Sequence, residues 1–285
     1  MRQRLQNIFN LPPVSFVTDI VKLYFGKHVS RSAAHLAYFL TLTFFPILIC
    51  ISAFMGKINL RLADLLAELE DLLPAGVYSI FQDYLGYLDS NFSLPMFITG
   101  VFLTILFASA AIRGLNTFGR ELYGQPRSWR PRQFLYSLLF ALLLLVTIYL
   151  SMAVMLTGNW FFHILGDLLG LTDLAQRFGV WQWLKYVILL AIVFLFILLL
   201  YRFTAPRRTP LPPVIPGALL ASVALVIASL IFAAIVSRSA RYSLVYGSLA
   251  SVIIMLVWLY LCGNILILGN VVNYVIFTRR NIKPI

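Results

Sequence analysis

Charged residues are scarce in this sequence of 285 residues. Only 11% of the chain is Asp, Glu, Lys or Arg, compared with about 25% in an ordinary soluble domain. Hydrophobic residues make up 61%, and the mean hydropathy is +0.91. A soluble domain of this length cannot bury so much apolar surface, so we expect lipid to surround most of the chain.

Metal-binding side chains and catalytic motifs are also rare. The two cysteines, Cys50 and Cys262, lie inside apolar runs, and only three histidines are present. This composition excludes a disulfide scaffold and a Cys-rich zinc site, so we expect no metal and no cofactor. The sequence lacks a phosphate-binding G-x-x-x-x-G-K-[ST] loop, an H-E-x-x-H pair and a G-x-S-x-G elbow, and we therefore predict a protein that is not an enzyme.

Six apolar runs are each long enough to cross a bilayer as a helix, which takes about 20 residues. Only helices and closed barrels satisfy their backbone hydrogen bonds in lipid, so we predict an all-α integral membrane protein with six transmembrane helices. The expected spans are Ala33–Met55, Leu94–Ile112, Phe134–Leu156, Trp183–Phe203, Val214–Val236 and one span within Leu244–Phe277. The last run is longer than one crossing requires, which leaves tilting, protrusion or a break near Gly263 or Gly269 open.

The cationic residues are distributed unevenly between the two sides of the predicted bundle. The side that holds both chain ends carries 16 of the 22 Lys and Arg but only two acids, Asp19 and Glu121. Positive charge collects on the cytoplasmic side of membrane proteins, so we expect both termini inside. The same asymmetry accounts for the net charge of +12 without a nucleic-acid partner.

The predicted spans divide the chain into a membrane domain and two short ends. We expect a cytoplasmic N-terminal segment at residues 1–32, a six-helix membrane domain at 33–277 and a cytoplasmic tail at 278–285. The longest outer connection, residues 56–93, has leucines at helical spacing between acidic residues, followed by a second apolar piece that contains Tyr84. It predicts short amphipathic outer helices that form a cap.

A few polar residues in or beside the spans are candidates for binding. Arg113 and Asn116 follow the second span and can bind a phosphate or carboxylate, or serve as interface anchors. An outer cluster follows the fifth span, where an anionic headgroup and pairing with outer acids remain alternatives; it consists of Arg238, Arg241, Tyr242 and Tyr246. Asn270 and Asn273 share a face of the sixth span and can either join helices or line a cavity.

Small residues recur at four-residue spacing in the last two spans. Gly217 and Ala221 form one such pair, and Gly247 and Ser251 form another. This spacing predicts a close approach of spans five and six, and it also permits a homo-oligomer.

The end of the chain, Y-G-S-L-A-S-V-I-I-M-L-V-W-L-Y followed by L-G and Asn, resembles the YihY/BrkB family of bacterial inner-membrane proteins. The resemblance continues along most of the chain. Its residues are Tyr38, Pro46, Pro216, Gly217, Tyr246, Gly247, Ser248, Leu249, Trp258, Tyr260, Gly269 and Asn273. This sequence departs from the family where an acidic residue is frequent, because the matching position holds Val271 and its small neighbour is replaced by Asn270.

The resemblance implies a multi-pass protein of the bacterial inner membrane that acts in transport or export, although the family was once labelled ribonuclease BN. No cluster of carboxylates or histidines supports RNA cleavage, so we regard ribonuclease activity as unlikely. Charges are absent from the centres of the spans, which favours the handling or transport of an envelope lipid or another anionic amphiphile, with membrane lipids and anionic headgroups as partners. A channel or carrier for a small solute and a non-transporting envelope scaffold remain alternatives.

Overall fold

The computed structural model describes residues 12–57, 78, 82–84, 86–87, 93–125, 131–169, 180–204, 214–237 and 249–281. Within these ranges the secondary structure is helical, without a strand. The helices are α2 (Pro12–Gly26), α3 (Val29–Lys57), α6 (Leu94–Leu122), α7 (Pro131–Leu169), α9 (Val180–Thr204), α10 (Ile215–Ser237) and α12 (Leu249–Asn281). Six of them, all except α2, are long and apolar enough to cross a membrane.

The predicted all-α class and its six apolar helices are therefore confirmed, and several helices extend beyond the expected spans, with α7 continuing 13 residues past Leu156. Helix α6 continues ten residues beyond Ile112, to Leu122. Helix α12 runs without interruption through Gly263 and Gly269, which removes the open alternative of a break. Its 33 residues correspond to about 50 Å, well over the roughly 30 Å of a hydrocarbon core, so one end of α12 protrudes or the helix is tilted.

Local signals explain both ends of the long helix α6. Ser93 precedes it in an extended conformation, and Pro95 stands in the first turn, where a missing N–H costs nothing. At the other end Gly124 adopts a positive φ of 66°, and the N–H of Gln125 donates to the carbonyl of Arg120 over 2.8 Å. This left-handed glycine cap satisfies the last carbonyl groups of the helix and ends it.

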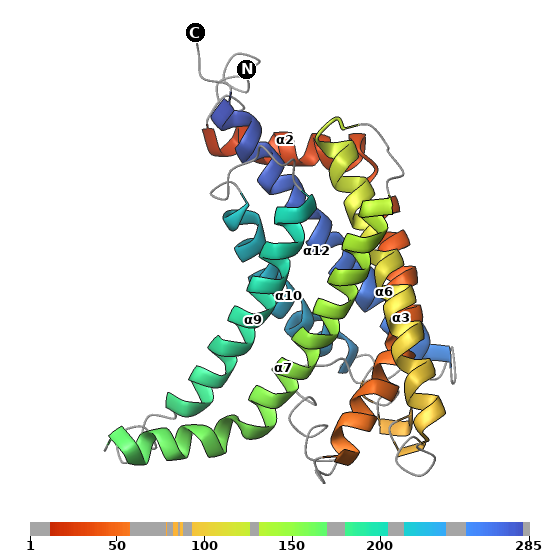
Figure 1. Ribbon diagram of the computed structural model, residues 1–285. Coiled ribbons are helices and arrows are strands. Elements are labelled where there is room, and N and C mark those ends of the chain that lie inside the picture. Colours follow the sequence, from red (N-terminus) through yellow and green to blue (C-terminus); the bar gives the residue numbers. More distant parts are fainter. Residues whose placement is uncertain are drawn as a thin grey trace, which may run out of the picture.

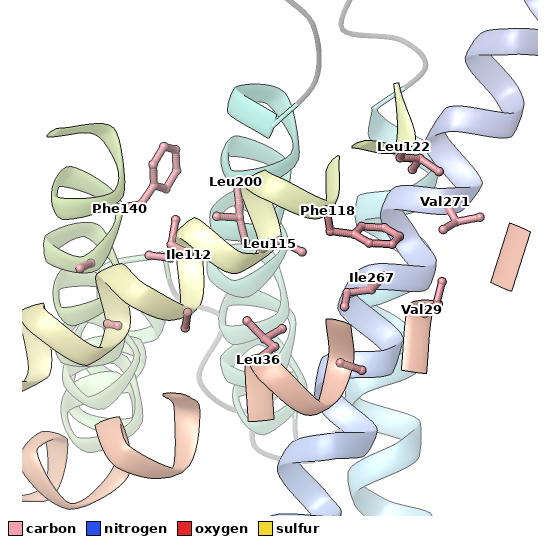
Figure 2. Packing of buried hydrophobic residues seen from close by; sticks show 14 of the residues in the cluster. Val29, Leu36, Ile112, Leu115, Phe118, Leu122, Phe140, Leu200, Ile267 and Val271 are labelled. Atoms are coloured by element: carbon pink, nitrogen blue, oxygen red, sulfur yellow. The ribbon is translucent and has the colours of Figure 1, made fainter. Parts of the chain in front are cut away.

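The six long helices contact one another in a closed ring, in the order α3, α6, α7, α9, α10, α12 and back to α3. Helix α6 also reaches α9 and α12 across the ring. The largest hydrophobic cluster lies where these helices meet, and Figure 2 shows Leu115 and Phe118 of α6 between Leu200 of α9 and Ile267 and Val271 of α12. This cluster fixes α12 against the rest of the bundle.

Helix α2 lies across one end of the bundle and is short compared with its neighbours (Figure 1). It contacts α3 and the middle and end of α12, where Asn264 and Arg279 are bound. The two ends of the described chain therefore lie on the same side, as an even number of crossings requires. The distribution of Lys and Arg predicts that this side is the cytoplasmic one.

The expected outer cap falls mostly outside the described residues. Its described part includes Tyr84, which is helical and packs its ring edge-on against Phe45 of α3, with ring centroids 5.4 Å apart. Burial raises the pKa of the Tyr84 hydroxyl above its usual value, with a smaller contribution from neighbouring Tyr87. At this position the segment packs against α3 twelve residues before the end of that helix.

Candidate functional site

A close approach between two spans joins the start of α10 to the second half of α12. A Cβ atom at Gly217 would collide with the carbonyl oxygen of Gly269 and with the side-chain oxygen of Asn273. A Cβ atom at Gly269 would lie 2.8 Å from the Gly217 carbonyl oxygen and 2.9 Å from the Ala221 Cβ. Both glycines are therefore needed for the contact, and the expected close approach of spans five and six is confirmed for the Gly217–Ala221 pair.

Asn273 uses this contact to cap α10 from a different helix. Ile215 and Pro216 are the first two residues of α10, so Gly217 is the third, whose N–H has no acceptor within its own helix. That N–H donates to the Asn273 Oδ1 atom over 2.8 Å. An N-cap side chain normally supplies this acceptor from the residue just before the helix. Here an asparagine 56 residues away supplies it.

The capping bond also fixes the direction of the Asn273 carboxamide. Since Oδ1 faces the Gly217 N–H, Nδ2 must point elsewhere, and it has no hydrogen-bond partner among the described residues. The Nδ2 atom of Asn270, one turn earlier, has none either. Both asparagines are 1% exposed. Two unpaired amide donors are thus buried near the α10–α12 contact, and a buried donor without an acceptor is unfavourable by about 1–3 kcal/mol.

A tyrosine from α9 completes this region. Tyr201 is fully buried, and its hydroxyl donates to the carbonyl oxygen of Leu266 on α12. The sequence analysis missed it, because a tyrosine at the end of an apolar run next to Arg202 is typical of a membrane interface. No feature of the sequence marks it as buried.

The aromatic residues of the terminal motif also join helices. The Trp258 indole N–H donates to the Ser229 hydroxyl of α10 over 3.3 Å. The hydroxyl groups of Tyr260 and Ser30 of α3 lie 2.7 Å apart. Together with Gly269 and Asn273, these residues connect α12 to α3 and α10, so the described part of the family motif holds the bundle together. Tyr38, by contrast, is exposed on α3.

Arg113 lies inside α6, nine residues before its end, rather than at the end of a span. Its guanidinium donates to the Ser109 hydroxyl over 3.0 Å and lies 5.3 Å from the centre of the Phe134 ring of α7. The side chain is half-buried, and no carboxylate of the described residues pairs with it. Asn116 is buried on the same helix.

A further polar contact joins α2 to the end of α12. The guanidinium of Arg279 forms an ion pair with Asp19 over 2.6 Å and also donates to the Ser15 hydroxyl over 3.0 Å. The Tyr24 hydroxyl donates to the Asn264 Oδ1 atom over 3.0 Å. Burial, followed by the neighbouring Tyr260, raises the pKa of Tyr24, so this donor keeps its proton at neutral pH.

Some predicted site residues lie outside the described residues. These are Arg238, Arg241, Tyr242, Tyr246, Gly247 and Ser248, so the outer cluster stays a prediction. Within the described ranges, no three His, Cys, Asp or Glu side chains come together in a group that can hold a metal ion.

These observations define a multi-pass helical membrane protein whose last span packs against α2, α3, α6 and α10. The sequence matches the profile of the family described as "Virulence factor BrkB" over residues 20–284, and the chain belongs to this family. No solved structure matches it.

Curated relatives agree with this assignment. The ribonuclease-like protein YfkH of Bacillus subtilis is 26% identical over 273 residues, which cover 94% of this chain and 98% of the relative. A UPF0761 membrane protein of Coxiella burnetii is 26% identical and covers 83% of this chain and 81% of its own length. A third relative, the UPF0761 membrane protein VV0203 of Vibrio vulnificus, is 31% identical over 85 residues, or 30% of this chain and 27% of its own.

Proposed function

We propose that this protein binds and moves an anionic amphiphile, such as an envelope lipid, in a bacterial inner membrane, and that it catalyses no reaction. The observation that carries the proposal is the position of Arg113 on α6. It is a cation without a described carboxylate partner, on a surface otherwise built for acyl chains.

The lipid-facing side of α6 leads to this arginine. Ile98, Phe102 and Leu106 are exposed and recur every four residues, which places them on one side of the helix. Arg113 lies seven residues after Leu106. Seven residues are about two turns of the helix, so Arg113 is on the same side as Leu106. Ile98 and Arg113 are 15 residues apart, or about 22 Å along the axis. An acyl chain that lies on this stripe can therefore place its headgroup at Arg113.

The immediate surroundings of Arg113 suit an anionic headgroup. Ser109 and the Phe134 ring hold the guanidinium at the boundary between α6 and α7 while it stays half-exposed. A guanidinium can bind phosphate or carboxylate oxygens with two parallel N–H groups, and lysine cannot reproduce this geometry. An amphiphile can reach this position sideways from the bilayer, because its tails never have to leave the lipid.

Carboxylates are scarce on the side of the protein that holds both chain ends, which supports a function without catalysis. Only Asp19 and Glu121 lie there, and Asp19 is engaged by Arg279. Hydrolysis of a phosphodiester with metal ions requires several clustered oxygen or nitrogen ligands. The name of the Bacillus subtilis relative contains the word ribonuclease-like, but we infer no such activity for this chain.

Reconstitution into vesicles with a fluorescent phosphatidylglycerol tests the proposal. Wild-type protein should bind this lipid and move it between the leaflets, whereas Arg113→Gln should lower binding or rate about tenfold, the effect of losing a charge-assisted hydrogen bond. Arg120→Gln is the matched control, because Arg120 lies on the same helix two turns closer to its end and should leave both quantities unchanged. Wild-type protein that neither binds nor moves the lipid, or equal activity of Arg113→Gln and wild type, would contradict the proposal.

A second candidate function, passage of a small polar solute, is favoured by the unpaired Nδ2 atoms of Asn270 and Asn273. Buried amide donors without acceptors can bind an oxygen of a passing solute. The distinguishing experiment measures solute flux into the same vesicles. Flux that is lost in Asn270→Leu while lipid movement persists would favour the solute pathway over the amphiphile.

A further inference from the structure

Helix α2 has three distinct sides. Its first side packs against the bundle through Phe16, Ile20, Leu23 and Tyr24, which join the largest hydrophobic cluster. Its second side is apolar but exposed: Val17, Val21 and Phe25 have 58%, 47% and 71% of their surface accessible. Its third side carries the exposed Lys22. An amphipathic helix on the surface of a soluble protein has polar residues on the side that faces solvent. The exposed second side of α2 is apolar instead.

The exposed apolar residues form a continuous stripe. Val17, Val21 and Phe25 follow one another at four-residue spacing, so they stack along one side of the helix. The stripe reaches from the first turn that has described side chains to the penultimate residue of α2. Exposed apolar residues are ordinary when scattered, but a row of three on a short helix indicates a surface that another apolar phase covers.

The orientation of α2 relative to the spans identifies that phase. Figure 1 shows α2 lying across one end of the bundle. We infer that the long helices leave the hydrocarbon core at this end. The spans present exposed apolar side chains to the surrounding lipid, so an apolar stripe on a crosswise helix at their end continues the same lipid-facing surface. A helix in this position lies at the depth of the headgroups and the first carbons of the acyl chains.

The charges around α2 match an anionic surface. Lys22 is exposed on α2, Lys27 follows in the turn between α2 and α3, and Arg31 is exposed in the first turn of α3. The one acid of α2, Asp19, is turned toward the bundle, where Arg279 neutralises it. The part of α2 that faces away from the bundle is thus apolar or cationic.

Two polar contacts with α12 oppose rotation of α2 about its axis. The Asp19–Arg279 ion pair and the Tyr24–Asn264 hydrogen bond attach two points of the helix, five residues apart, to α12. The stripe cannot turn toward the bundle without breaking both contacts. The exposure of Val17, Val21 and Phe25 is therefore a property of the folded protein.

We propose that α2 is an in-plane membrane helix. Its Val17–Val21–Phe25 stripe inserts among the acyl chains of the leaflet at the end of the bundle where α2 and the last turn of α12 meet. Lys22, Lys27 and Arg31 bind the anionic headgroups of the same leaflet. The partner of this surface is the lipid bilayer, and the surface is separate from the Arg113 region of α6.

Site-directed spin labelling of the full chain in vesicles tests this inference. Cys50 and Cys262 are first replaced by alanine, and single cysteines are then placed at Val17, Val21 and Phe25. Controls at Lys22 and Leu23 sample the other two sides of the same helix. The measurement compares collisions of each label with oxygen, which concentrates in lipid, and with a water-soluble nickel complex. Vesicles contain phosphatidylcholine with or without phosphatidylglycerol.

We expect the three stripe positions to favour oxygen, Lys22 to favour nickel and Leu23 to be shielded from both. Nickel access at the stripe equal to that at Lys22 would overturn the proposal, because the stripe would then face water. Shielding of the stripe together with spin–spin broadening would also overturn it, since a second copy of the chain would cover the surface.

A change of lipid composition tests whether the lysines bind anionic headgroups. Removal of phosphatidylglycerol should move the stripe labels to shallower depth, and this shift should disappear when Lys22→Gln and Lys27→Gln are combined. Leu23 should not respond in either case, because the bundle covers it. Labels that keep their depth in zwitterionic vesicles would refute the role of the lysines.

Discussion

The backbone N–H of Gly217 donates a hydrogen bond of 2.8 Å to the side-chain oxygen of Asn273, so the last span caps the first turn of the preceding one. This single bond requires the α10–α12 contact, because the two helices approach closely where Gly217 meets Gly269. It also determines the direction of the Asn273 amide, and thereby leaves Nδ2 without a partner. Helix capping, close packing and an unsatisfied donor are consequences of one arrangement.

Replacement of Asn273 and Asn270 by leucine should have opposite effects on stability. Asn273→Leu removes the acceptor of the Gly217 N–H and leaves that group buried and unpaired, which should cost about 1–3 kcal/mol. Asn270→Leu removes a buried amide whose Nδ2 has no partner, so stability should stay equal or rise. Thermal unfolding in detergent measures both variants against wild type. Equal destabilisation by the two substitutions would show that the Asn270 amide has an acceptor in the working protein.

The Gly217–Gly269 contact predicts a large effect of one methyl group. Gly217→Ala places a Cβ atom against the Gly269 carbonyl oxygen, which belongs to the backbone and cannot move aside alone. We expect a loss of about 1–3 kcal/mol, as for other overpacked interiors, and a lower unfolding temperature. Gly26→Ala is the matched control, because no atom lies within 4 Å of its Cβ position. If Gly217→Ala unfolds at the wild-type temperature, α10 and α12 are farther apart than described.

Much of this fold follows from hydropathy alone, because lipid leaves a span no alternative to the helix. The ends of the helices are harder to predict. The last ten residues of α6 contain Arg113, Arg120 and Glu121, which interrupt the apolar run without interrupting the backbone hydrogen bonds. The cap at Gly124 determines where the helix ends.

The candidate site is less visible in the sequence than the fold. Asn270 and Asn273 stand out as amides in an apolar run, but the partner of Asn273 is a backbone group of another helix. One sequence does not show which helices are neighbours. Tyr201 is a similar case, since its buried hydroxyl binds a carbonyl oxygen that carries no side-chain signature.

The ion pair between Asp19 and Arg279 should contribute little to stability, and substitution of its two members should have unequal costs. Their side chains are 45% and 34% exposed, so a double-mutant cycle of Asp19→Asn and Arg279→Gln should give a coupling of about 0.2–1 kcal/mol. Arg279→Gln alone should cost more than Asp19→Asn, because Arg279 also binds Ser15 and lies over the Phe16 ring. A coupling well above this range in detergent would indicate that lipid or protein shields the pair from solvent.

Labelling from one side of the membrane tests the predicted orientation. In the variant without Cys50 and Cys262, a cysteine at Gln125 reports the end of the bundle near α2, and one at Ser93 reports the opposite end. Charge predicts that an impermeant maleimide reaches Ser93→Cys in intact spheroplasts, and Gln125→Cys only after permeabilisation. The reverse pattern would place both chain ends outside.

Tyr123 links stability to alkaline pH. It caps the end of α6, where its ring contacts Tyr274 and Phe277 edge-on, and burial raises the pKa of its hydroxyl to about 12, with a smaller contribution from Tyr274. The unfolded chain loses this proton near pH 10, so between about pH 10 and 12 the folded state binds more protons than the unfolded state. Stability from this group is therefore complete below pH 10 and is lost as the pH rises toward 12.

Unfolding temperatures in detergent should fall less steeply over this range for Tyr123→Phe than for wild type, because phenylalanine keeps the ring contacts and cannot ionise. Parallel curves for the two proteins would mean that the hydroxyl is hydrated in the folded state.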